Sequence, residues 1–475
     1  MGIPKLLWRV SNGEHPPVAP SPVVRAAARE VAALTDEVAR RRRIDRRAFL
    51  RSSMGSAATL LALAACSDRE RRSSGATTSA GTFQVPTSAA RDPEAATTTL
   101  APFEGEVVID VQTHFLDPDT VGFGRGFPQA ACGPDPTTCF TIDRWADLVF
   151  GASDTAVAVL SALPVVADPH PMSIAKMEEA RRVAEALCDA DRVLLQGEAF
   201  PQVGELAAAL DRMGELAEAH RLVAWKTYTH LGATYSFTDP VGGAFLAHVS
   251  ELAAAGVGPS VVCVHKGFGA DPADVGPAAR AHPELTFCVY HSGYEPGGPS
   301  EGPFDEQGQG VDRLLRSLRD AGVGPGANVY AELGSTWYHA LRDPDEAAHV
   351  VGKLLVALGP ERILWGTDSV WYGSPQDQIE AFRSFTISEE AQERFGYPAL
   401  TDDVKRAVLG ANAARLHGLD LPALQGSCRA ADADEAAGER EEAAGSLGPL
   451  GDAALGPSTA AEAAAAFAVA HPWFS

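Results

Sequence analysis

The stretch EVVIDVQTHFLDP (residues 106–118) decides the fold, because an apolar strand pattern runs directly into polar side chains. Residues 107–111 form a nearly continuous β-branched run, which is typical of a parallel strand buried on both faces. Gln112 and His114 follow at the end of this run. The stretch therefore predicts a buried strand that presents a glutamine and a histidine at its carboxyl end.

Seven similar apolar runs follow in the sequence, and helix-like segments separate them. We predict strands at 156–160, 193–200, 223–228, 261–265, 286–291, 329–333 and 363–368. The segment 173–190 has apolar residues at three- and four-residue spacing, which indicates an amphipathic helix. Eight strands interleaved with helices predict an α/β fold, a (β/α)8 TIM barrel, over residues 106–419. A doubly wound open sheet is the alternative, but no Gly-x-Gly-x-x-Gly turn follows the first strand.

Polar residues stand at the carboxyl ends of several predicted strands, where a barrel of this kind places its chemistry. A single histidine there would most often be structural, but random placement would scatter histidines over helices and loops as well. Imidazole nitrogen and carboxylate oxygen suit zinc and related divalent ions, and a catalytic site keeps one position open for water. The residues at these strand ends are Gln112, His114, Lys226, His230, His265, His291 and Asp368.

Six short motifs in these regions resemble the amidohydrolase-related branch of the amidohydrolase superfamily, the group that contains aminocarboxymuconate-semialdehyde decarboxylase. They are DVQTHF (110–115), THLG (229–232), VHKGF (264–268), YHSGYE (290–295), WGTDSVW (365–371) and LGANAARLHGL (409–419). The resemblance implies that His114, His230 and Asp368 bind a metal ion, with Gln112 at the position of the family's first histidine. It also implies that His265, Asp368 and His291 carry the acid–base chemistry, and that Lys226 and Trp371 contact substrate.

The resemblance implies a divalent metal, zinc or alternatively manganese, which lowers the pKa of its bound water from about 16 toward 7. We therefore expect a hydrolase that acts on a small lactone, amide or related C–O or C–N bond. Non-oxidative decarboxylation of an aromatic or unsaturated carboxylic acid is the alternative, because the same side chains serve both reactions. A ligand-binding lipoprotein with a degenerate metal site is a third hypothesis. Because a neutral amide oxygen is a weaker zinc ligand than imidazole, Gln112 predicts looser metal binding or only a hydrogen bond.

Residues 1–66 resemble an export leader. Arg46 and Arg47 precede a short Ala/Leu run, which ends in Leu-Ala-Ala-Cys at residues 63–66. Twin arginines before a weakly apolar segment resemble the twin-arginine signal, and the final four residues resemble a lipobox. We expect export to the periplasm or cell surface with a lipid on Cys66; an arginine-rich cytoplasmic tail with an Ala-rich helix is the alternative.

Two segments flank the predicted barrel and contain few large apolar residues. Residues 67–105 are rich in Ser, Thr, Ala and Pro, so a disordered N-terminal leader and flexible linker are expected. Residues 420–475 form an acidic, Ala-rich tail. In an oxidising compartment Cys132 and Cys139 are candidates for a loop-closing disulfide, whereas Cys263 and Cys288 fit buried thiols.

The net charge of the chain limits the classes of partner that we expect. A formal net charge of −23 argues against a nucleic-acid partner, since phosphate binding needs clustered Lys and Arg. We expect a small-molecule substrate and membrane attachment only through the lipid on Cys66. The sequence leaves open whether the chain forms a homodimer.

Overall fold

A computed structural model describes residues 4–15, 17–75, 78–117, 140–166, 170–188, 190–230 and 234–425. Eight parallel strands form one sheet in sequential order, each paired with the next along the chain. They are β2 (Val108–Thr113), β3 (Thr155–Leu160), β4 (Val193–Glu198), β5 (Leu222–Tyr228), β6 (Val261–His265), β7 (Thr286–Tyr290), β8 (Val329–Glu332) and β9 (Ile363–Leu364). All eight overlap the strands predicted from the sequence.

The sheet closes between its first and last strands through backbone contacts just beyond β9. Thr113 forms a parallel bridge with Ser369, and the Val111 amide donates to the Trp365 carbonyl at 3.0 Å. The His114 amide donates to the Ser369 carbonyl at 2.6 Å. The predicted (β/α)8 TIM barrel is therefore confirmed, and the carboxyl ends of all eight strands meet at one mouth.

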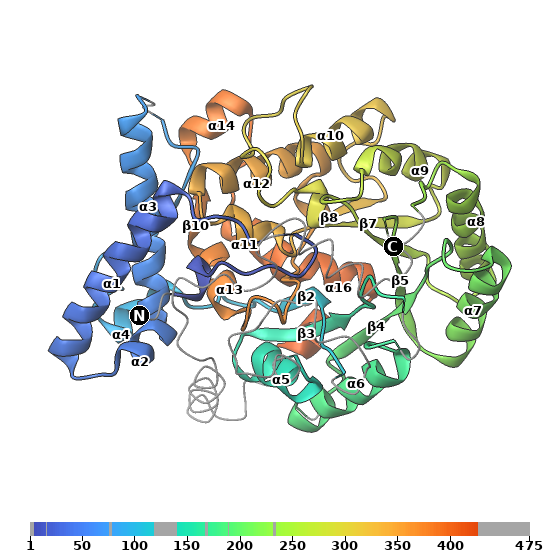
Figure 1. Ribbon diagram of the computed structural model, residues 1–475, viewed down its shortest axis with the longest axis horizontal. Coiled ribbons are helices and arrows are strands. Elements are labelled where there is room, and N and C mark those ends of the chain that lie inside the picture. The colour runs from blue at the N-terminus through green and yellow to red at the C-terminus, as the bar shows by residue number, and fades with distance from the viewer. Residues whose placement is uncertain are drawn as a thin grey trace.

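Helices surround the sheet on its outer side (Figure 1). The first five are α5 (Ile142–Ala146), α6 (Ile174–Cys188), α7 (Leu206–Ala219), α8 (Pro240–Ala254) and α9 (Val275–Ala281). Those that follow are α10 (Val311–Asp320), α11 (Thr336–Ala340), α12 (Pro344–Leu358), α13 (Gln376–Ser384), α14 (Glu389–Phe395), α15 (Asp402–Arg406) and α16 (Asn412–His417).

Local sequence explains why these helices begin and end where they do, and α12 is an example. The side chain of Asp343 accepts from the Asp345 amide, and Pro344 occupies the first helical turn. Gly359 follows the last residue with φ 84°, a conformation that favours glycine.

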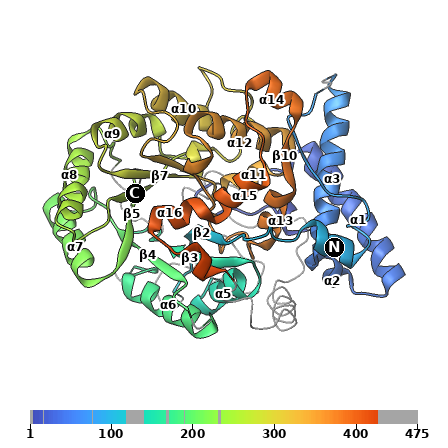
Figure 2. The same cartoon turned by 180° about the vertical axis from the view of Figure 1, so that it is seen from behind.

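The helix α16 belongs to the closing Gly-x-Asn-Ala-x-Arg motif and lies at the opposite end of the barrel from the mouth. Asn412 Nδ2 donates to the carbonyls of Pro360 and Ile363 where β9 begins, both at 2.8 Å. A Cβ at Gly410 would lie 1.9 Å from the Val107 carbonyl oxygen, so only glycine fits there. Figure 2 shows α16 in front of β2 and β3 on this side.

Residues 22–73 form three helices beside the barrel, drawn in blue in Figure 1: α1 (Pro22–Arg42), α2 (Arg46–Arg51) and α3 (Ser53–Ser73). The expectation of a disordered leader is therefore wrong for these residues. Leu60 and Leu63 are fully buried, and burying one such side chain contributes about 1.5–3 kcal/mol. Asp45, next to the twin arginines, caps α2 by accepting from the Arg47 amide at 2.7 Å.

The segment predicted as a flexible linker, 67–105, is also folded where it is described. The strand β1 (Gly81–Phe83) pairs antiparallel with β10 (Phe385–Ile387), and α4 (Pro93–Thr99) follows. A Cβ at Gly81 would lie 2.5 Å from the Pro344 carbonyl oxygen, so glycine permits this close approach. The composition argument failed because the barrel's own helices supply the apolar surface that the segment lacks. Its small buried side chains are Ala80, Ala89, Ala90 and Ala96, with Phe83 and Val85.

Two expectations lie partly or wholly outside the described residues. The predicted C-terminal tail is described only through α17 (Leu421–Leu424) and Gln425, and Cys132 and Cys139 are not described. Cys66, Cys263 and Cys288 are buried free thiols. Within the described ranges, no helix is both long and apolar enough to cross a membrane.

Candidate functional site

His114 lies at the barrel mouth directly after β2, and a backbone carbonyl fixes the orientation of its ring. Its Nδ1 lies 3.0 Å from the Ser161 carbonyl oxygen, so in the neutral ring Nδ1 carries the proton and donates. The Nε2 lone pair then faces Asp368 Oδ1 at 3.3 Å. A proton or a metal ion between two lone pairs at that distance would bind both of them. A carbonyl behind a histidine ligand is a common feature of metal sites.

Asp368 follows β9 in a left-handed conformation with φ 57°, which a non-glycine residue rarely adopts. Burial would raise the pKa of Asp368, but its hydrogen bonds with His114 and Ser335 and the nearby histidine charges lower it to about 2. Its carboxylate is therefore ionised at neutral pH. Ser335 Oγ donates to Oδ2 at 2.5 Å, and the indole Nε1 of Trp371 donates to Oδ1 at 3.3 Å.

Gln112 takes part in the site as a hydrogen-bond donor. Its Nε2 lies 3.1 Å from Asp368 Oδ1, and 3.5 Å from the Nε2 atoms of both His114 and His291. Its Oε1 has no hydrogen-bond partner in the described part of the chain. The amide nitrogen, rather than the oxygen, therefore faces the carboxylate.

His291 begins the short turn η5 (His291–Gly293) after β7, with φ 64°. Its Nδ1 donates to the Gly334 carbonyl at 2.7 Å, which leaves the Nε2 lone pair directed at Gln112. Burial lowers the pKa of His291 to about 4. His291 is therefore a neutral imidazole at physiological pH, able to accept a proton. Non-glycine residues with positive φ at both His291 and Asp368 indicate backbone strain of the kind found at functional sites.

His265 and His230 form a second group at the mouth, together with Glu14 from the N-terminal segment. Ligand atoms of these three residues lie within 4.8 Å of one another. His265 Nδ1 is 3.3 Å from Glu14 Oε1, and its ring centroid is 4.5 Å from those of both His230 and His291. His265 thus connects the two groups. Burial lowers the pKa of His265 well below its ordinary value, and burial with the nearby Asp368 raises the pKa of Glu14 to about 8.

Lys226 lies on the floor of the mouth, fully buried, near the end of β5. Its Nζ sits 3.6 Å from the centroid of the Tyr290 ring and meets no hydrogen-bond acceptor in the described residues. Burial lowers the pKa of Lys226 to about 8. Trp371 forms part of the wall, with its ring centroid 6.1 Å from that of His114.

The structure therefore brings together His114, Asp368, Gln112 and His291, which were predicted from strand ends. It places His230 with His265 and Glu14. Sequence reasoning missed Asn12 and Glu14, because residues 11–15 lie in a segment interpreted as a leader. The one signal was the Asn-Gly turn pair flanked by an acid and a histidine, SNGEH.

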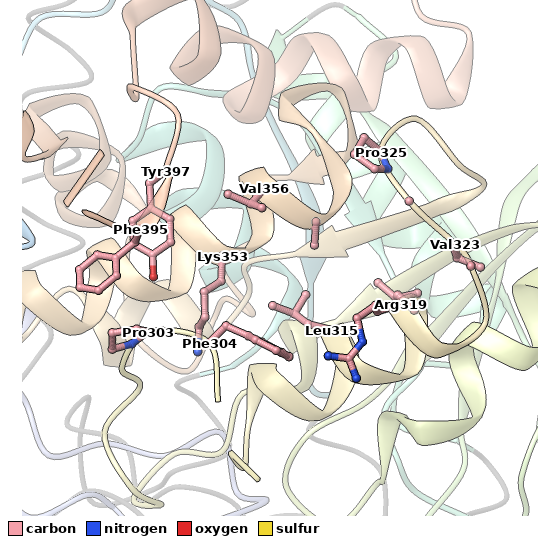
Figure 3. A pocket seen from close by; sticks show the side chains of 14 residues that line it. Pro303, Phe304, Leu315, Arg319, Val323, Pro325, Lys353, Val356, Phe395 and Tyr397 are labelled. Carbon is pink, nitrogen blue, oxygen red and sulfur yellow. The ribbon is translucent and has the colours of Figure 1, made fainter. Parts of the chain in front are cut away.

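Another pocket, of about 690 Å³, lies outside the barrel between α10 and α12 (Figure 3). Its walls include Phe304, Leu315, Val356 and Phe395, and the only ammonium among its lining residues is that of Lys353. Lys353 Nζ is already bound to Glu301 Oε2 at 2.5 Å and Asp312 Oδ1 at 2.7 Å. This pocket lacks the donor groups of the mouth, so we do not assign the chemistry to it.

Comparison with solved structures gave low-identity matches. A 2,6-dihydroxybenzoate decarboxylase complexed with 2,6-dihydroxybenzoate is 15% identical, with a TM-score of 0.37 over 66% of this chain and 100% of that one. Amidohydrolase 2 from Bifidobacterium longum subsp. infantis is 17% identical, with a TM-score of 0.33 over 66% and 100%. The 4-oxalomesaconate hydratase from Rhodopseudomonas palustris is 13% identical, with a TM-score of 0.37 over 68% and 98%.

Two comparisons were made by sequence, one with curated proteins and one with family models. No curated protein matches the chain. The family model described as Amidohydrolase matches residues 109–419, which is the whole barrel and more than half of the chain. The protein therefore belongs to the amidohydrolase family.

Proposed function

We propose that this amidohydrolase is a metal-dependent hydrolase of a small lactone, amide or related C–O or C–N bond. The observation that carries the proposal is the 3.3 Å approach of His114 Nε2 to Asp368 Oδ1, both buried. A zinc-like cation fits there, because an imidazole nitrogen and an ionised carboxylate face each other and are each oriented by further hydrogen bonds. His114 and Asp368 would hold the cation, with zinc as the first candidate and manganese as the second.

A bound divalent cation would supply Lewis acidity toward a substrate oxygen and make water nucleophilic near neutral pH. The chain's own residues would do the rest. His291 is neutral, and its Nε2 faces Gln112 beside His114 and Asp368. It can therefore accept the proton that water loses on attack and return it to the leaving oxygen or nitrogen. Its Nδ1 bond to Gly334 holds the ring in this orientation. The indole of Trp371 would form an apolar wall against the substrate.

Gln112 would have a supporting role in this arrangement. Because its Nε2 donates to Asp368 Oδ1, it orients the carboxylate without contributing a ligand oxygen. We infer that Gln112 fixes the direction of the Asp368 lone pairs, and that the missing imidazole lowers metal affinity rather than abolishing it.

A second candidate reaction is the non-oxidative decarboxylation of an aromatic or unsaturated carboxylic acid. Lys226 favours it, because a buried amine without a hydrogen-bond acceptor in the described residues can pair with a substrate carboxylate. In that reaction a proton replaces the lost carboxyl group on carbon, and carbon dioxide leaves.

The purified full chain, loaded with Zn²⁺ or Mn²⁺, should be incubated with a panel of lactones, amides and aromatic acids. We expect acid release from a lactone or amide, lost in His291→Gln and kept in the exposed control Glu37→Gln. Carbon dioxide release without any hydrolysis product would replace hydrolysis by decarboxylation. No turnover in any arm, together with ligand binding in a calorimeter, would favour a binding protein.

A further inference from the structure

The residues 11–15 form a tight turn at the barrel mouth. The Gly13 amide donates to Ser11 Oγ at 2.9 Å, and the Glu14 amide donates to Asn12 Oδ1 at 3.0 Å. Gly13 has φ 95°, a conformation that other residues rarely adopt. Ser11, Asn12 and His15 are all buried. The sequence SNGEH thus builds its own conformation and is packed into the protein.

The segment just before this turn is fastened to the barrel by two side chains from beyond β8. The Tyr338 hydroxyl lies 3.1 Å from the carbonyl oxygens of both Lys5 and Trp8, which share its one proton. Arg342 Nε donates to the Leu6 carbonyl at 3.1 Å. Leu6 and its neighbour are only 2% exposed. The segment that leads into the turn is therefore bound to the barrel by side chains that follow β8.

Asn12 connects the turn to the barrel's own chemistry. Its Nδ2 donates to Glu14 Oε2 at 2.6 Å and to Asp368 Oδ2 at 3.0 Å. One amide group thereby separates two carboxylates and orients both. The other oxygen of Glu14, Oε1, is directed at His265 Nδ1, 3.3 Å away.

The histidine facing Glu14 is oriented to receive a cation. His265 Nε2 donates to the Phe268 carbonyl at 3.3 Å, so its Nδ1 carries the lone pair. That lone pair and Glu14 Oε1 face each other, and His230 adds a third donor within 4.8 Å. Two imidazoles and one carboxylate make up a ligand set that zinc uses in catalytic sites, with a position left for water or substrate.

We propose that Glu14, His230 and His265 bind a divalent transition-metal cation beside the one proposed between His114 and Asp368, so that the N-terminal segment contributes a ligand at the barrel mouth. This inference rests on the proposed function, because it concerns the same mouth. It goes beyond that function by assigning a ligand to a segment outside the matched family region. The chemical class of the cation follows from the donors: nitrogen-rich sets favour zinc, cobalt or copper over magnesium or calcium.

The test is metal binding by the full chain after chelation and dialysis, with Zn²⁺ by equilibrium dialysis and Co²⁺ by its visible absorption spectrum. The variants are Glu14→Gln, His230→Gln and Asp368→Ala. Glu37→Gln on α1 is the matched control, since this exposed residue contacts only Arg91 among the described ion pairs. Circular dichroism shows whether each variant is folded, and His230→Gln tests the same site from a different element.

We expect the parent and Glu37→Gln to bind Zn²⁺ equally. Glu14→Gln and His230→Gln should each bind it at least about tenfold more weakly and change the Co²⁺ spectrum. Parent affinity and an unchanged spectrum in both variants would overturn the inference. If Asp368→Ala alone then lost the metal, the proposed function would stand without it. Absence of metal binding by the parent would overturn both.

Discussion

Replacement of Asn12 by alanine should lower the free energy of unfolding, because Asn12 joins the N-terminal turn to Asp368 at the barrel mouth. Its Nδ2 donates to two carboxylates, at 2.6 and 3.0 Å. The raised pKa of Glu14 leaves its carboxyl largely protonated at neutral pH. A hydrogen bond to the charged Asp368 contributes about 1.5–3 kcal/mol to stability and one to a neutral group about 0.5–1.5 kcal/mol, so losing both should lower the free energy of unfolding by about 2 kcal/mol or more. In an Asp368→Ala background only the bond to Glu14 remains to be lost. The cost of Asn12→Ala should then fall by about 1.5 kcal/mol or more.

Urea denaturation of the parent, the two single variants and the double variant, all in excess chelator at neutral pH, gives this coupling energy. Asn328→Ala is the matched control, because Asn328 Nδ2 lies within hydrogen-bond distance of three backbone carbonyls, those of Ala279, His282 and Leu285, and of no carboxylate. Its effect should add to that of Asp368→Ala. If the Asn12 and Asp368 effects also add within about 0.5 kcal/mol, the N-terminal turn is not docked on the site and the reasoning fails.

Three further outcomes are expected. Gly13→Ala should lower the free energy of unfolding by about 1–3 kcal/mol, because φ 95° strains any side chain, and a denaturation midpoint equal to the parent's would contradict this. Arg383→Met should cost about 3–5 kcal/mol by calorimetry, because it leaves the Glu106 and Asp154 carboxylates without their buried partner. Burial raises the pKa of Glu346 from 4.5 to about 7, so the folded protein binds this proton more tightly than the unfolded chain. Its stability contribution is full below pH 4.5 and is lost as the pH rises through 7. Glu346→Gln should flatten that loss in pH-dependent denaturation curves, and an unchanged slope would exclude Glu346 as its source.

The barrel could be predicted from the sequence because its strands are buried on both faces. Runs such as 156–160 and 261–264 are therefore apolar throughout, and no tertiary information is needed to recognise them. The convergence of His114, His291 and Asp368 followed from topology, since parallel strand ends meet at one mouth.

The N-terminal part could not be predicted in the same way, because its burial depends on distant partners. Arg46, one of the twin arginines that suggested a leader, forms an ion pair with Asp36 on α1. Other arginines of the N-terminal part pair with distant acids, as Arg42 does with Asp92 at 3.0 Å and Arg71 with Asp345 at 3.4 Å. Residues 11–15 have no periodic apolar pattern at all. Their contact with the barrel runs through Asn12 to Asp368, and the segment just before them is bound by Tyr338 and Arg342, all more than three hundred residues away in sequence.

Export and a lipid on Cys66 stay predictions, and the structure shows what processing would remove. Cys66 is 3% exposed within α3. Cleavage before it would release α1, α2 and most of α3, together with Asn12 and Glu14. A mature protein that begins at Cys66 would therefore have a mouth without the N-terminal carboxylate, and Asp368 would lose one of its hydrogen-bond donors.

The central claim is that the barrel mouth is a metal centre built on His114 and Asp368. The most direct test is elemental analysis of the full chain and its Asp368→Ala variant, purified without an affinity metal. The account predicts at least one equivalent of transition metal in the parent, or a return to that level after adding Zn²⁺ or Mn²⁺, and about one equivalent less in the variant, which lacks the Asp368 ligand. Less than about a tenth of an equivalent in the parent, with no gain after either metal is added, would contradict it.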